Sequence, residues 1–78
     1  MYTENMKMAF HSIRAPKNFG VRLEDNGNFL VIRAKEDIFM RLDGEGRLAA
    51  AEYMIRVKKA LEDQGAIVLI VREGGKPE

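Results

Sequence analysis

His11 is the only histidine in the sequence, and it is the one side chain suited to general-base chemistry near neutral pH. Its neighbour Ser12 could act as a nucleophile only within reach of that base. In an extended strand, however, adjacent residues point to opposite faces. The chain contains no cysteine, no histidine pair and no clustered carboxylates. We therefore expect a protein that is not an enzyme, with no metal site and no cofactor, and we interpret His11 as an ordinary surface residue.

A second short motif, "DGEGR" at 43–47, has the composition of an anion-binding turn. Glycines at the start of a helix leave free N–H groups, and Arg47 could add a positive charge, so Gly44, Gly46 and Arg47 form a possible anion site. The motif is much shorter than a nucleotide-binding fingerprint, and Asp43 and Glu45 would repel a phosphate. A plain strand-to-helix turn, with Asp43 as N-cap, is the preferred interpretation.

Arginines alternate with apolar residues in the predicted strands, and together they define a candidate binding face on the sheet. This predicted face consists of Phe29, Val31, Phe39, Val68, Ile70, Arg22, Arg33 and Arg41. It could be covered by residues 1–14 acting as a lid, by a second copy of the chain, by another protein or by a ligand. It could also bind single-stranded nucleic acid, with phenylalanines stacking on bases and arginines contacting phosphates.

The elements that would position this face begin with a hairpin. The stretch "NFGVRLEDNGNFLVIRA" (18–34) contains two alternating runs around Asn26-Gly27, the dipeptide favoured in a two-residue type I′ turn. Placing the turn there puts apolar pairs on one face of the sheet, namely Leu23 with Leu30, Val21 with Ile32 and Phe19 with Ala34. The stretch "IFMRL" (38–42) alternates in the same way and predicts a third antiparallel strand, with Phe39 and Arg41 on the opposite face.

A long helix is predicted from the turn at 43–46 to Gln64, with Gly65 as its left-handed C-terminal cap. Its apolar stripe, at helical spacing, consists of Ala50, Tyr53, Met54, Val57, Ala60 and Leu61. The last strand, 66–72, begins with six apolar residues in a row, which favours a central position in the sheet. We expect Ile67, Leu69 and Val71 to lie beneath the helix and Val68 and Ile70 to face the other side.

Residues 6–14 fit two patterns. Met6, Met8 and Phe10 alternate as in a strand, whereas Met6, Ala9, Phe10 and Ile13 fit one face of a helix; the strand is preferred. The expected fold is α+β: an antiparallel β-meander of three or four strands, one long helix packed across the sheet, and a final strand returned by that helix. We expect 1–78 to be a single domain with a flexible tail at about 74–78.

Composition restricts the partners. The net charge is +1, and 46% hydrophobic with 32% charged residues is typical of a folded protein that does not enter membranes. The absence of cysteine and of a signal peptide favours a cytoplasmic location. The sequence thus predicts a small non-enzymatic interaction or regulatory module, a homodimer that also binds another protein. A single-stranded nucleic-acid-binding protein that uses the same face is the alternative.

Overall fold

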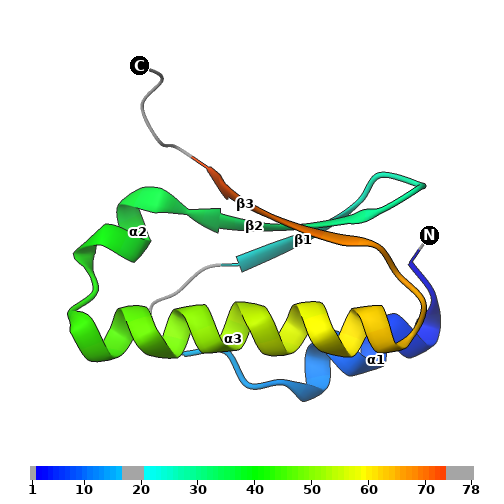
Figure 1. Cartoon of the computed structure of the whole chain (residues 1–78), viewed down its shortest axis with the longest axis horizontal. Helices are drawn as coiled ribbons and strands as arrows, with labels where there is room; N and C mark the ends of the chain where they lie inside the picture. Colours follow the sequence, from blue (N-terminus) through cyan, green and yellow to red (C-terminus); the bar gives the residue numbers. More distant parts are fainter. Residues whose placement is uncertain (1, 17–20, 74–78) are drawn as a thin grey trace.

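The computed structural model of the chain describes residues 2–16 and 21–73. It shows a small α+β fold with a three-stranded mixed sheet and a long helix packed across it. The strand order is β1 (Val21–Asp25), β2 (Leu30–Lys35), β3 (Val68–Glu73). Helices α1 (Glu4–Ser12) and α3 (Gly44–Asp63) lie on the same side of the sheet (Figure 1). The predicted tail at 74–78 and the predicted pair of Phe19 with Ala34 involve residues outside the described part of the chain.

The first element is a helix, α1 (Glu4–Ser12), so the preferred prediction of a strand at 6–14 was wrong. Thr3 caps it, because its hydroxyl oxygen accepts a hydrogen bond from the Met6 N–H at 3.2 Å. Met6 is buried, and Phe10 and Ile13 pack against the core from the same helical face. The helical spacing of the apolar residues, which lets them pack toward α3, therefore predicts the structure of this segment better than their short alternation does.

The predicted hairpin is present as β1 (Val21–Asp25) and β2 (Leu30–Lys35). Its register differs by two residues from the prediction, since Leu23 pairs with Ile32 instead of Leu30. The reason is that the turn lies one residue later: the Asn26 N–H donates to the Phe29 carbonyl at 2.9 Å, which leaves Gly27 and Asn28 as the central residues. A shift of two residues keeps every side chain on its predicted face.

The predicted third strand is a helix, α2 (Glu36–Arg41), which continues directly from β2. Two acidic residues, Glu36 and Asp37, occupy its first turn, where the helix dipole favours negative charge. Ile38, Phe39 and Leu42 pack against the core as a helical face would. The antiparallel meander was therefore wrong: β1 and β2 are antiparallel, and β2 pairs in parallel with the last strand.

Helix α3 (Gly44–Asp63) confirms the predicted apolar stripe, since Ala50, Tyr53, Met54, Val57 and Leu61 are all buried. At its start the Gly46 N–H donates to Asp43 Oδ1 at 2.7 Å. At its end Gly65 has a φ of 95°. Two hydrogen bonds end the helix: the Gly65 N–H donates to the Glu62 carbonyl, and the Ala66 N–H donates to the Leu61 carbonyl. This is the Schellman arrangement expected of a glycine after a helix.

Strand β3 (Val68–Glu73) returns from α3 and lies at the edge of the sheet, so the prediction of a central position was wrong. The predicted facing of this strand was also wrong. Leu30 and Ile32 face the helix, and β3 places Val68 and Ile70 opposite them, on that same face. Val68 is consequently in the core, at 3% exposure, together with Leu30, Ile32, Val57 and Leu61.

Candidate functional site

The sheet face turned away from α3, here called the outer face, carries two rows of residues across the three strands. One row is Glu24, Val31 and Leu69, and the other is Arg22, Arg33 and Val71. Of the eight residues predicted for the candidate binding face, the structure thus brings together Arg22, Val31 and Arg33. Val31 is only 3% exposed, so the apolar centre of this face is already covered.

The arginines of the outer face are engaged with a carboxylate on that face. Arg33 Nε lies 2.8 Å from Glu24 Oε1, and an Arg22 terminal nitrogen lies 3.8 Å from Glu24 Oε2. The hydrogen bond from Arg33 is the main reason why the pKa of Glu24 is lowered, and the two positive charges lower it further. One carboxylate therefore offsets part of the positive charge of the two arginines on this face.

The other predicted face residues lie elsewhere. Phe39 is on α2, where its ring packs against the core and the Arg72 guanidinium sits 5.0 Å above it. Arg41 is exposed at the end of the same helix. Phe29 is half-buried in the hairpin loop and borders a small hollow beside Ala66 and Ile67. The predicted alternation of phenylalanine and arginine therefore does not form one platform.

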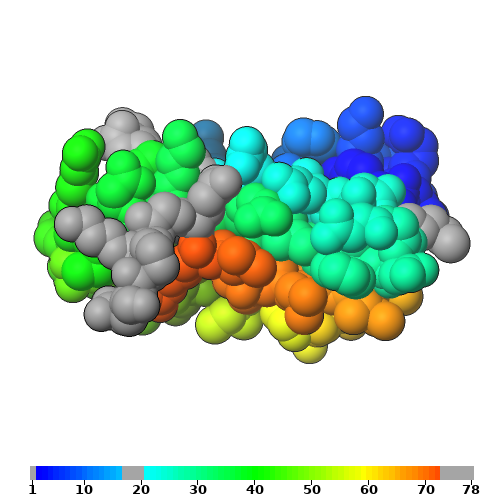
Figure 2. All heavy atoms as spheres, turned by 90° about the horizontal axis from the view of Figure 1, so that it is seen from above, coloured from blue at the N-terminus to red at the C-terminus, as the bar shows by residue number. Residues whose placement is uncertain are grey.

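The most exposed apolar part of the sheet is its β3 side. Ile67 is 66% exposed, Leu69 47% and Ile70 39%. Within residues 2–16 and 21–73, no strand pairs with the outward side of β3. Figure 2 shows β3 in orange along one margin of the sheet, with α3 beneath it. We call the outward backbone of β3 and these three side chains the β3 edge.

Sequence reasoning missed Ile67 and Leu69, which it placed beneath the helix. A run of apolar residues has no alternation, so its pattern cannot tell which set faces the core. The only residue of the run that is fully buried is Val68, because it lies opposite Leu30. The pairing register with β2, and not the composition of the strand, decides which side chains remain exposed.

The predicted anion site is occupied by the chain's own groups. The Gly46 N–H is bonded to Asp43, and a terminal nitrogen of Arg47 donates to the Met40 carbonyl at 3.0 Å. A side chain at position 46 would meet Leu42 Cβ at 3.1 Å, which explains a glycine there without a ligand. Gly44 and Gly46 with Arg47 thus belong to a turn capped by Asp43, as preferred, but the turn joins helix α2 to α3 and not a strand to a helix.

Ser12 and His11 each make a contact of their own, and no hydrogen bond joins the two side chains in the structure. The Ser12 hydroxyl donates to the Ala9 carbonyl at 2.8 Å, and the exposed His11 ring packs edge-on against Phe10 at 5.3 Å between centroids. In the described part of the chain, no group of three or more metal-ligating side chains could hold an ion. No described helix is both long and apolar enough to cross a membrane.

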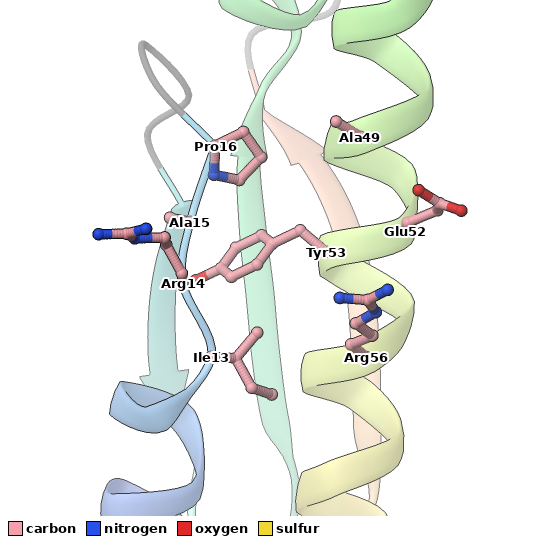
Figure 3. Close-up of a pocket in the computed structure, with 8 residues that line it drawn as sticks. All are labelled: Ile13, Arg14, Ala15, Pro16, Ala49, Glu52, Tyr53 and Arg56. Carbon is pink, nitrogen blue, oxygen red and sulfur yellow. The ribbon is translucent and has the colours of Figure 1, made fainter.

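The clearest hollow lies between residues 13–16 and the first half of α3, a groove of about 360 Å³. Figure 3 shows Tyr53 reaching from α3 across its floor, with Ile13 and Pro16 on either side of the ring. The Tyr53 side chain is buried, and burial raises the pKa of its hydroxyl above the usual value. The phenol therefore stays protonated at neutral pH, and its hydroxyl can donate or accept a hydrogen bond.

Three charged side chains line the rim of this groove: Arg14, Glu52 and Arg56. In Figure 3 the Arg14 guanidinium points away from α3 and the Glu52 carboxylate points away from Tyr53. No described acid or base is aimed at another across the groove. The groove is open rather than an enclosed pocket, and Glu52 is the one carboxylate among its described lining residues.

No family model matches the sequence, and comparison with curated proteins and with solved structures finds no similar chain.

Proposed function

We propose that this chain is a small non-enzymatic interaction module that forms a homodimer and binds another macromolecule. The observation that supports it is the β3 edge, where exposed apolar side chains coincide with backbone that no other described strand pairs. Soluble proteins usually protect such edges with charges, proline or a covering element. Residues 68–71, Val-Leu-Ile-Val, contain neither charge nor proline.

The proposed contact surface differs from the face expected from the sequence. On the outer face Val31 is buried and Arg33 is bonded to Glu24, so the exposed apolar area of that face lies on its β3 side, at Leu69. At the β3 edge Ile67, Leu69 and Ile70 are all exposed. Covering them would remove apolar surface from water and pair backbone groups at the same time.

A non-enzymatic role agrees with the local chemistry. The Ser12 hydroxyl is held by a backbone carbonyl, and among the described residues that line the Tyr53 groove no acid and base are directed at each other (Figure 3). No contact among the described residues specifically favours the alternative, binding of single-stranded nucleic acid. Arg22 and Arg33 share Glu24 on the outer face, and Phe39 lies on α2, away from the sheet face where stacking was expected.

Light scattering after size-exclusion chromatography tests this proposal directly. We expect the wild-type chain to have the mass of two chains and Ile70→Lys that of one, because the lysine would place a charge at the centre of the β3 edge. Met8→Lys is the control, since Met8 is also an exposed apolar residue, at 66% against 39% for Ile70, but lies on α1. A wild-type monomer at about 500 µM, where a dissociation constant as weak as about 1 mM would still be visible, would refute the proposal.

Phe39→Asp would not report on association. Phe39 packs against the core and beneath Arg72, so an aspartate there would disturb α2 and the fold itself. Ile70 is at the edge and partly exposed, which makes its replacement by lysine compatible with the folded chain.

A further inference from the structure

The hydrogen bonds between β2 and β3 determine which backbone groups of β3 point outward. The Leu30 N–H donates to the Ile67 carbonyl at 2.8 Å, while Leu30 itself is aligned with Val68. In a parallel ladder a residue bonds to the two residues that flank its aligned partner, and the direction alternates along the strand. Ile67, Leu69 and Val71 therefore direct their backbone groups toward β2. The alternate residues, Val68, Ile70 and Arg72, direct theirs outward.

From this alternation we infer that two copies of the chain join β3 to β3 in antiparallel order about a two-fold axis at Ile70, giving one continuous six-stranded sheet. The inference rests on the proposed function and names its first partner, a second copy. Ile70 would pair with Ile70 of the second copy, and Val68 with Arg72 of the second copy. These are the outward-pointing residues, so each pair would exchange two N–H···O=C bonds.

The side chains of β3 fit this register with themselves. On the outer face Leu69 would lie beside Val71 of the second copy, at a non-hydrogen-bonded position where side chains approach most closely. On the helix-facing side Ile70 would meet its own symmetry mate. The Arg72 charge would face Val68 and no second arginine, and it is already engaged, since one of its terminal nitrogens lies 3.4 Å from Glu36.

Antiparallel pairing with the axis at Ile70 is favoured over an axis at Leu69 and over parallel addition of copies. Centring the axis on Leu69 would bring Arg72 opposite Ala66, which precedes the strand. Parallel addition of copies is heterologous and would not close, whereas the antiparallel pairing uses the same edge twice and leaves none of it unpaired. The dimer would also extend the apolar outer row from Val31 through Leu69 into the second copy.

Amide hydrogen exchange measured by NMR tests the inference without mutation. At high protein concentration we expect the amides of Val68, Ile70 and Arg72 to exchange at least about tenfold more slowly than after dilution to monomer. The amides of Leu69 and Val71, already bonded toward β2, should change much less. Protection of Leu69 and Val71 with no change at Ile70 would overturn the inferred pairing.

Disulfide cross-linking tests the register. Because the chain has no native cysteine, only the introduced cysteines can form a disulfide. Leu69→Cys with Val71→Cys in one chain should give mainly disulfide-linked dimer under mild oxidation, because the two sites face each other across the axis. Met8→Cys, on α1, measures random collision. The reduced double variant should keep the wild-type circular dichroism spectrum, which shows that it is folded.

Each other outcome has a distinct meaning. Cross-linking of Leu69→Cys or Val71→Cys alone, as fast as the double variant, would move the axis to that residue and overturn the register. A wild-type dimer in which the double variant cross-links only at the Met8→Cys rate would overturn pairing through β3 while leaving the homodimer. A wild-type monomer would overturn the proposed function itself.

Discussion

At the scale of single residues, backbone conformation restricts the sequence at Gly27, one of two glycines with a positive φ in the described part of the chain. It has a φ of 87° as the first central residue of the hairpin turn, and its N–H is bonded to Asp25 Oδ1 at 2.8 Å. A β-branched side chain is strained there although the space around it is open. We expect Gly27→Val to lower the free energy of unfolding by more than about 1 kcal/mol.

Chemical denaturation of Gly27→Val measures this cost, and Gly44→Ala is its control. Gly44 also has open space for a side chain but lies in the first turn of α3 without a positive φ. The control should be neutral or slightly stabilising, because alanine favours a helix. Equal destabilisation by both changes would mean that the backbone angle at Gly27 is not what matters.

Tyr53 gives a prediction for alkaline pH. Burial raises the pKa of its hydroxyl above the ordinary value of 10.0, so the folded chain holds this proton more tightly than the unfolded chain does. The stability is therefore complete below the unfolded pKa and is lost as the pH rises through the folded one. We expect the melting temperature of Tyr53→Phe to fall less than that of the wild type between about pH 9 and pH 11. Parallel curves for the two proteins would contradict this.

At the scale of elements, what the sequence could predict depended on length and capping. The long stripe of α3 covers several turns and ends at Gly65, so its period is unambiguous. The segments 6–14 and 38–42 are short enough that alternating and helical spacing fit the same residues. Their helical state is decided by local and tertiary contacts, the Thr3 cap for α1 and the packing of Ile38 and Phe39 on the core for α2.

The cap of α3 can be tested at the same scale. Asp43 Oδ1 accepts the Gly46 N–H at 2.7 Å, and Arg47 N–H bonds the Asp43 carbonyl at 2.9 Å. We expect Asp43→Ala to cost about 1 kcal/mol of unfolding free energy, because a helix-end N–H loses its acceptor. Asp43→Asn keeps an acceptor oxygen and should cost much less. If Asn is as damaging as Ala in thermal denaturation, the negative charge matters more than the cap.

At the scale of the whole molecule, the candidate site could be predicted only in part. The hairpin faces were correct because a shift of two residues preserves them, so Arg22, Val31 and Arg33 lie on the outer face as expected. The place of β3 was not predictable from composition, since both of its faces are apolar. An apolar run suits a central strand, but it also suits an edge that a second chain completes. The sequence of one chain cannot distinguish these two cases, because the neighbouring strand belongs to the same chain in the first and to a second chain in the other.

That difference has a thermodynamic consequence. If the second copy completes the sheet, unfolding is coupled to dissociation, and the melting temperature must rise with protein concentration. A hundredfold increase in concentration shifts the equilibrium by about 2.7 kcal/mol per dimer, which corresponds to on the order of 5–10 °C for domains of this size. Ile70→Lys, which cannot pair at the β3 edge, should melt at one temperature at all concentrations. It should also melt below wild type at the highest concentration, because it loses the contribution of the second chain. Calorimetry or circular dichroism over that range measures both effects, and a concentration-independent wild type would contradict the dimer.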